Sequence, residues 1–319
     1  MSKKEEVIEF IRMMVQKNKP DKIILERLHR DKMLDISLST LHRYKKEYGI
    51  VRYDGPISPA VVSRAIEEWR MGIGMNAGVQ SLQQILREDG LLVNRRQVHD
   101  FVTVMNGNPR PVPQRGVTKR TLRYSPGPNH RWCVDGYDKL GPYGIYIHGC
   151  IDEYPRKLLW LRAYAINRKR EVAVEYYLKA IIGGGDFGNE YNKTATCQYF
   201  FYRHDLNATP RHRWTYSIVN VTIEAFWRRV GAISAQYWMN ELQSLVQDKL
   251  WDENEVDIAC TYAVYLPFIN KDLDRVINQH DSHGIRKQIR NGRRPIRPSG
   301  VPEDIYLMPD LYGGDLRAL

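Results

Sequence analysis

The sequence predicts all-helical units at the N-terminus followed by an α/β domain, with a sheet flanked by helices. Apolar residues recur at helical spacing up to about residue 105, and short β-branched and aromatic runs replace them after residue 130. The net charge of +11 is equally uneven: residues 1–130 hold 23 Lys and Arg against 14 Asp and Glu, whereas residues 131–275 hold 18 of each. A basic region joined to a charge-balanced one is typical of a polyanion-binding module beside a second domain, although a merely soluble basic segment has the same charge.

Length and composition exclude several classes of protein. The 319 residues are 43% hydrophobic, which is too apolar for a disordered chain. No apolar run reaches the roughly 18 residues of a membrane span, and the first residues lack the apolar centre of a signal peptide. The four cysteines lie far apart, so we expect reduced core residues and no cysteine zinc site. These features predict an intracellular protein in a reducing compartment, without a membrane partner.

Residues 1–50 are expected to form the first helical unit. Helices are predicted over 3–17 and 21–31, and Ser37 or Ser39 can cap a third that ends before Gly49. Three short helices with a basic last member indicate a helix-turn-helix, whose recognition helix presents its N-terminal residues to DNA bases. The candidate DNA-contacting residues are Ser39, Thr40, His42 and Arg43.

The pattern recurs in residues 55–105, the second helix-turn-helix-like unit. Helices are predicted over 58–70 and 78–89, and a third opens near residue 93 with two arginines at its start. Its candidate DNA-contacting residues are Arg95, Arg96 and Gln97. A helical bundle that packs against a partner protein, as in a basic adaptor, fits the same periodicity.

Residues 106–130 form a linker rich in proline, glycine and arginine, with almost no apolar periodicity. Its basic residues include Arg120 and Arg123, which are candidate DNA contacts because they can follow a phosphate backbone. A solvated linker needs no such role.

After residue 130 the pattern changes to strands. Apolar runs at 132–135, 144–152 and 157–164, separated by Gly-Pro and Tyr-Pro turns, predict an antiparallel meander. Amphipathic helices are predicted over 168–182 and 220–230. Between them, 190–204 is expected to be helical and 213–216 extended.

Three carboxylates occupy comparable positions in these elements. Asp135 ends the first predicted strand, Asp186 opens a helix after three glycines, and Glu224 lies one turn into the helix over 220–230. Carboxylate oxygens are the ligands that Mg²⁺ prefers, and metal pairs held in this way support phosphoryl transfer.

Several longer motifs carry a family resemblance. Residues 123–140 contain Gly-Pro-Asn-x-x-Trp-x-x-Asp-Gly-x-x-Lys-Leu, and 147–157 contain Ile-His-Gly-Cys-Ile-Asp. The stretches 186–190, 220–227, 278–286 and 297–306 continue the similarity. With these motifs the chain resembles eukaryotic integrase core domain proteins, which are similar to retroviral integrases and to DDE transposases.

The resemblance implies a ribonuclease H-like fold, with a mixed sheet flanked by helices, for the catalytic core, here 131–270, followed by a C-terminal extension, 271–319. It also implies that the protein has no small-molecule substrate. It implies that Asp135, Asp186 and Glu224 are the catalytic residues and the ligands of two Mg²⁺ or Mn²⁺ ions in a polynucleotidyl transferase. It also implies DNA as the substrate, a homo-oligomer on DNA, a transposable-element origin and a nuclear or nucleocytoplasmic location.

Other residues in the matching motifs are expected to be structural. Asp152 begins a turn, and His148 and Cys150 lie within a strand. His280, Asp281 and His283 could imitate a metal cluster, but we expect a solvated helix end.

The sequence also departs from the family pattern. Only Gly183, Gly184 and Gly185 separate the preceding helix from Asp186, where the fold needs a strand, so either residues 174–182 supply that strand or it is lost. Val221 and Thr222 stand where the family has Gln-Arg. Two hypotheses follow: an integrase or transposase that joins DNA strands, or a degenerate or domesticated relative that binds nucleic acid without cutting it.

Overall fold

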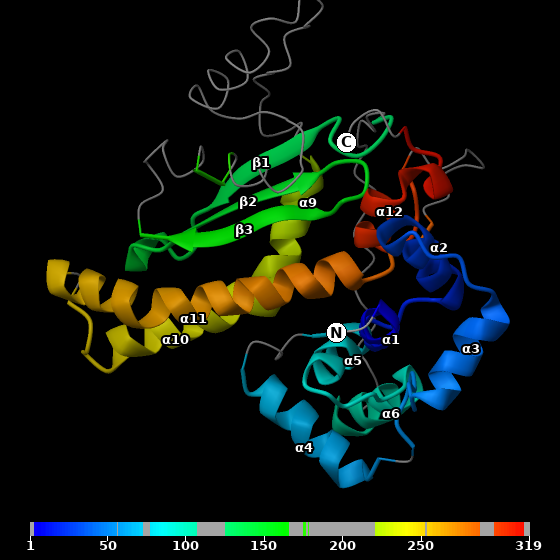
Figure 1. The fold of residues 1–319 in the computed structure, drawn as a ribbon. Helices are drawn as coiled ribbons and strands as arrows, with labels where there is room; N and C mark the ends of the chain where they lie inside the picture. Colours follow the sequence, from blue (N-terminus) through cyan, green and yellow to red (C-terminus); the bar gives the residue numbers. More distant parts are fainter. Residues whose placement is uncertain are drawn as a thin grey trace, which may run out of the picture. The chain divides into compact units, whose positions relative to one another are not determined.

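The structure is a computed structural model that describes residues 3–55, 57–72, 77–106, 125–165, 175–176, 178, 221–252, 254–287 and 297–315. The chain divides into two compact units (Figure 1). The helical unit comprises residues 1–71 and 77–112, and the sheet unit comprises 72–76 and 113–319.

The helical unit contains two clusters of three helices at the positions that the periodicity predicts. The helices are α1 (Lys3–Gln16), α2 (Asp21–Lys32), α3 (Leu38–Glu47), α4 (Pro59–Arg70), α5 (Val79–Glu88) and α6 (Arg95–Asn106). Fully buried Ile11, Ile24 and Leu28 centre the first cluster. Leu82 and Val98 do the same in the second cluster.

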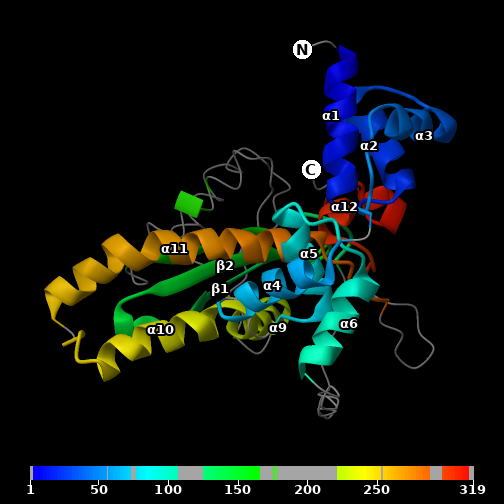
Figure 2. The ribbon, with the colours of Figure 1, turned by 90° about the horizontal axis from the view of Figure 1, so that it is seen from below.

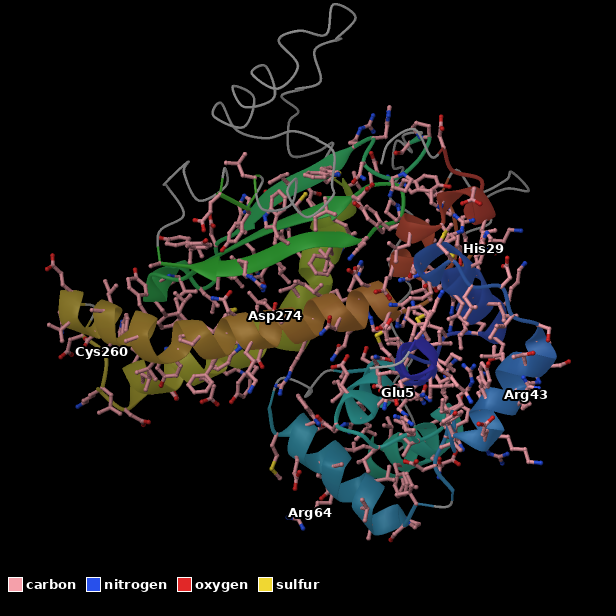
Figure 3. All side chains as sticks on the ribbon, in the orientation of Figure 1. Glu5, His29, Arg43, Arg64, Cys260 and Asp274 are labelled. Atoms are coloured by element: carbon pink, nitrogen blue, oxygen red, sulfur yellow. The ribbon has the colours of Figure 1, made fainter. Side chains whose placement is uncertain are left out.

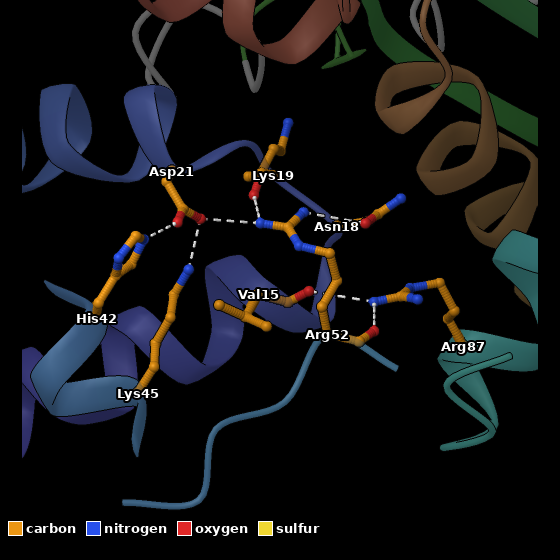
Figure 4. Close-up of polar contacts among 8 residues, drawn as sticks. All are labelled: Val15, Asn18, Lys19, Asp21, His42, Lys45, Arg52 and Arg87. Carbon is orange, nitrogen blue, oxygen red and sulfur yellow. Dashed lines mark hydrogen bonds and ion pairs between the residues drawn. The ribbon is translucent and has the colours of Figure 1, made fainter. Parts of the chain in front are cut away.

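A carboxylate at the start of α2 joins the helices of the first cluster. Asp21 accepts hydrogen bonds from His42 and Lys45 of α3 and from Arg52 in the segment after it (Figure 4). A negative charge is favourable at a helix N-terminus, and here two cations, Lys45 and Arg52, also bond to it. Asp21 therefore links α2 to α3 and to the segment that follows α3.

Arg87 of α5 extends this network to the second cluster. Its guanidinium donates to the main-chain oxygens of Val15 and Arg52, at 3.2 and 2.9 Å (Figure 4). It also donates to the main-chain oxygen of Gln16 at 3.1 Å. Val15 and Gln16 end α1, and the last carbonyls of a helix have no partner within it. Arg87 donates to both carbonyls, of which that of Val15 also accepts from the main chain of Asn18, so the two clusters share a bonded contact.

The sheet unit contains a three-stranded antiparallel sheet of order β1-β2-β3. Its strands are β1 (Trp132–Tyr137), β2 (Tyr146–Asp152) and β3 (Leu158–Tyr164), with the short helix η1 (Gly141–Tyr143) between the first two. The predicted meander is confirmed. Within the described ranges the sheet has no parallel pair, so the expectation of a mixed sheet is met only in its antiparallel part.

The segments 190–204 and 213–216, like Asp186 and the three glycines before it, lie outside the described residues. Of the helix predicted over 168–182, the structure describes Glu175, Tyr176 and Leu178, and all three are helical. They do not contribute a strand to the sheet.

Helices cover one face of the sheet. They are α9 (Val221–Val230), the π-helical turn η3 (Gly231–Ala235), α10 (Gln236–Gln247) and α11 (Glu255–Ser282) (Figures 1 and 2). Ile147 and Leu161 of the sheet share a core there with Phe226 and Leu273. A smaller cluster on the other face contains Trp132 and Trp160.

The helix α11 corrects three expectations. It crosses residue 270 without a break, so the boundary expected there falls inside a helix. Its end is buried, not solvated: Asp281 accepts from Lys157 and from the main chain of Leu158, and His280 bonds to the carbonyl of Arg156. Cys260 on α11 is exposed, whereas Cys133 and Cys150 are buried as predicted.

After α11, the short helices α12 (Pro302–Leu307) and η4 (Pro309–Tyr312) end the described chain. Arg297, just before them, bonds to Glu153 in the β2–β3 turn and to Thr222 of α9. None of the described helices combines the length and apolar character needed to cross a membrane.

Candidate active site

Strand β1 directs Asp135 toward α9. Side chains alternate along a strand, so Asp135 shares a face with Cys133 and Tyr137, which belong to or pack against the core under α9, α10 and α11. Asp135 pairs with Gly149 of β2. The strand continues to Tyr137, so Asp135 lies within β1 and the expectation that it ends the strand is wrong by two residues.

Two donors fix the Asp135 carboxylate. The indole Nε1 of Trp227 on α9 donates to Oδ2 at 2.9 Å, and the main-chain nitrogen of Gly136 donates to Oδ1 at 2.9 Å. Each carboxylate oxygen has two lone pairs, so with the donors of the described residues one on each oxygen remains for another ligand. The two bonds fix the orientation of the carboxylate and leave it able to accept a further ligand.

Asp135 also has no positive partner in the part of the chain that the structure describes. Among the described residues, no Lys, Arg or His is bonded to it. Burial raises its pKa, the bonds from Trp227 and Gly136 oppose that rise, and the nearby charge of Asp138 adds to it. A bound cation would favour the ionised form, as cations do for their ligands.

Glu224 lies on the helix that supplies Trp227. It is exposed on α9 and precedes Trp227 by three residues, a spacing that places both on one side of a helix. The structure thus connects Asp135 with the helix of Glu224, while Asp186 lies outside the described residues. Across the described part of the chain, no group of three or more His, Cys, Asp or Glu side chains is placed to hold a metal ion.

The sequence assigned Trp227 only to an apolar stripe and missed its bond to Asp135. One signal could have suggested a polar role, because a buried indole N–H usually has a hydrogen-bond partner. Trp227 is 7% exposed, and the apolar stripe alone leaves its N–H without one.

The remaining polar residues of the strand motifs are structural, as expected. Asp152 is fully buried and accepts from the main chain of Asn129 and Tyr154, while burial raises its pKa to about 8. His148 stacks on Trp160 and accepts from its indole at 2.9 Å, and burial lowers the pKa of His148 to about 4. These residues tie the strands and turns together.

Candidate DNA contacts on α3 differ in their availability. Ser37 caps the helix through the main-chain nitrogen of Thr40. Ser39 and Arg43, four residues apart, are exposed, and Figure 3 shows Arg43 projecting from α3. His42 is bonded to Asp21, so part of its hydrogen-bonding capacity is already used.

The candidate DNA contacts on α6 also include both exposed residues and a residue that is already bonded within the helix. Arg95 and Arg96 are exposed, and Arg96 lies 3.9 Å from Asp100. Gln97 and Asn94 form a reciprocal cap, each bonding the other's main-chain nitrogen. Gln97 therefore helps to start the helix, and Arg120 and Arg123 lie outside the described residues.

A comparison with protein families decides the relationship. A family model described as an integrase core domain matches residues 124–297, which is more than half of the chain. The chain belongs to the integrase core domain family. The resemblance carried by the motifs is thus confirmed, and the match covers β1, β2, β3, α9, α10 and α11. No curated protein matches this integrase core domain protein.

Membership has consequences for fold and chemistry. The family implies a ribonuclease H-like fold and an integrase-like or transposase-like activity that generally depends on a divalent metal. The described sheet and helices form part of such a fold. The helical unit precedes the matched residues, so its role is a separate question.

Proposed function

We propose that this integrase core domain protein is a polynucleotidyl transferase that cleaves and joins DNA strands with a divalent metal, using Asp135, Asp186 and Glu224. The observation that carries the proposal is the bond between Trp227 and Asp135. It ties the first candidate ligand to the helix that bears Glu224. Family membership adds the reaction class.

The residues fit Mg²⁺ or Mn²⁺. Asp135 and Glu224 offer only carboxylate oxygens, which suit hard divalent cations, and Asp135 has an unbonded lone pair on each oxygen and no cation of its own among the described residues. Two bound ions would activate an attacking oxygen and stabilise the leaving one in phosphodiester chemistry. Asp135, held by Trp227 and Gly136, would bind without reorienting.

For the rest of the chain, we propose that the helical unit binds DNA and directs the core to its substrate. Exposed Arg43, Arg95 and Arg96, with Ser39, Thr40 and Gln97, supply candidate contacts. Arg120 and Arg123 would follow the phosphate backbone. A homo-oligomer on DNA and a nuclear or nucleocytoplasmic location belong to the same proposal.

The proposed chemistry is tested by nicking and strand-transfer assays on DNA duplexes with Mg²⁺ or Mn²⁺. Glu224→Gln keeps the shape of the side chain and removes its charge. The matched control is Glu241→Gln, another exposed helical glutamate, on α10. We expect activity in the natural chain and the control and none in Glu224→Gln. DNA binding without metal-dependent chemistry in all three proteins would indicate the degenerate, binding-only relative.

DNA binding is tested separately by measuring affinity over a range of salt concentrations. Arg43→Gln should weaken binding and reduce the slope of log affinity against log salt by about one if Arg43 contacts a phosphate. Arg64→Gln is the control because Arg64 is an exposed arginine of α4, paired with Glu68 (Figure 3). Equal losses in the two variants would contradict a specific role for α3.

A further inference from the structure

The indole of Trp227 lies against the strand pair that carries Asp135. Asp135 of β1 and Gly149 of β2 are partners in the sheet register. The ring carbon Cη2 of Trp227 lies above Gly149, while Nε1 of the same ring bonds to Asp135. One side chain of α9 thus covers both members of the pair.

Gly149 allows the indole of Trp227 to lie this close to the sheet. A Cβ at that position would lie 2.7 Å from Cη2 of Trp227 and 3.2 Å from a methyl group of Leu161. The first distance is shorter than any normal carbon contact, so a larger residue would displace the indole. The absence of a side chain at residue 149 therefore brings the N–H within reach of Asp135.

The indole is also held from its other sides. Trp227 is 7% exposed, and the rings of Tyr137 and Phe226 lie 5.4 and 5.8 Å from it. A ring fixed by packing presents its N–H in one direction. Such a donor orients a carboxylate more firmly than a flexible polar side chain does.

We propose that Trp227, seated on Gly149, is a positioning residue that orients the Asp135 carboxylate toward a divalent cation. This inference rests on the proposed function, because it assigns the cation to Asp135. Hydrogen-bond partners of metal ligands fix ligand orientation, and their loss typically weakens metal binding about 10–100-fold. Trp227 itself touches no reacting atom.

The chain contains a matched control for this pair. Nε1 of Trp238 on α10 donates to Oδ2 of Asp272 on α11 at 3.0 Å. Unlike Asp135, Asp272 also accepts from an arginine, Arg275, at 3.2 Å. The two pairs share their chemistry, but only Asp135 is without a cation among the residues described.

The test uses the full chain with ¹⁵N-labelled tryptophan and the metal alone. Indole N–H resonances are followed during Mg²⁺ titration, and Trp227→Phe and Trp238→Phe assign the two signals. Mn²⁺ affinity is measured in parallel from the paramagnetic resonance of the free ion. We expect a saturable shift of the Trp227 signal, a constant Trp238 signal, and Mn²⁺ affinity lowered about 10–100-fold in Trp227→Phe and unchanged in Trp238→Phe.

A second variant guards against a folding defect. Gly149→Ala keeps the indole but forces it to move, so it should weaken Mn²⁺ binding while the Trp238 resonance stays in place. Unchanged Mn²⁺ affinity in Trp227→Phe, alongside binding that Asp135→Asn abolishes, would overturn the positioning role and leave the proposed function standing. If the natural chain showed no Asp135-dependent Mn²⁺ binding, the metal site and the positioning role would both be refuted.

Discussion

Asp21 in the helical unit and Asp135 in the sheet unit are the same side chain in opposite surroundings. Asp21 accepts bonds from His42, Lys45 and Arg52. Asp135 accepts one bond from an indole and one from a main-chain nitrogen. The first carboxylate has cations of its own chain around it, and the donors to the second, among the described residues, are all neutral.

The pKa values of Asp21 and Asp135 are shifted in opposite directions from the ordinary value of an aspartate. Burial acts to raise the pKa of Asp21, but hydrogen bonds from Lys45 and His42 keep it below its ordinary value. Burial raises the pKa of Asp135, and its neutral donors oppose this only in part. A carboxylate compensated by its own chain stabilises the fold, whereas a positioned but uncompensated one is suited to bind a cation from outside.

The largest difference is expected from replacing each aspartate with asparagine. Asp135→Asn should reduce metal-dependent nicking by roughly 10³-fold or more, because a charged ligand is lost at the centre of the reaction. Asp21→Asn should leave the specific rate on saturating DNA within about twofold of that of the natural chain, since no step of the chemistry uses it. Nicking rates at saturating metal distinguish the two. A comparable loss in both variants would end the distinction between structural and catalytic carboxylates.

Removing Arg87 should break the helical unit's network at its most buried point. Arg87→Met removes the guanidinium from the carbonyls of Val15, Gln16 and Arg52, of which that of Val15 keeps its bond from the main chain of Asn18, so we expect a loss of about 2–3 kcal/mol. Arg64→Met is the control, because the exposed pair of Arg64 with Glu68 contributes at most about 0.5 kcal/mol. Amide hydrogen exchange should show the loss in α1 and α5. Equal protection in the two variants would mean that Arg87 does not join the clusters.

The sequence predicted the helices of the first 106 residues and the three strands because these depend on local periodicity. It also selected Asp135 and Glu224 through motifs of contiguous residues. The strand end at Asp135 was wrong because apolar content falls before the pairing with β2 stops. Local pattern sets the existence of an element better than its last residue.

The contacts between distant segments were not predictable in this way. The Trp227 bond needs the β1–β2 register, the glycine at 149 and the placement of α9 together. The buried end of α11 depends on Asp281 meeting Lys157, which is 124 residues away in sequence. From sequence alone, a polar helix end that is buried against a distant partner looks the same as one that is exposed to solvent.

A smaller effect is expected from the stability contribution of Asp21. Its pKa is lowered in the folded chain, so the contribution is present above the unfolded value near pH 3.9 and is lost as pH falls through the folded value. Asp21→Asn should therefore cost about 1 kcal/mol at pH 7, and the difference from the natural chain should shrink below about pH 4. Urea unfolding from pH 3 to pH 7 measures both. A difference that grew toward low pH would have the wrong sign for a compensated carboxylate.

The smallest effect is expected at Asp35. Its carboxylate contacts one histidine, whereas the carboxylate of Asp21 bonds to three side chains. Asp35 bonds to His29 at 2.7 Å, as closely as Asp21 bonds to His42 at 2.9 Å, but both members of the first pair are well exposed. Water screens such a pair, so Asp35→Asn should change stability by less than about 0.5 kcal/mol at pH 7. The same urea series compares it with Asp21→Asn. If the two variants lost equal stability, one histidine contact would suffice, and the additional bonds of Asp21 to Lys45 and Arg52 would no longer explain its difference from Asp135.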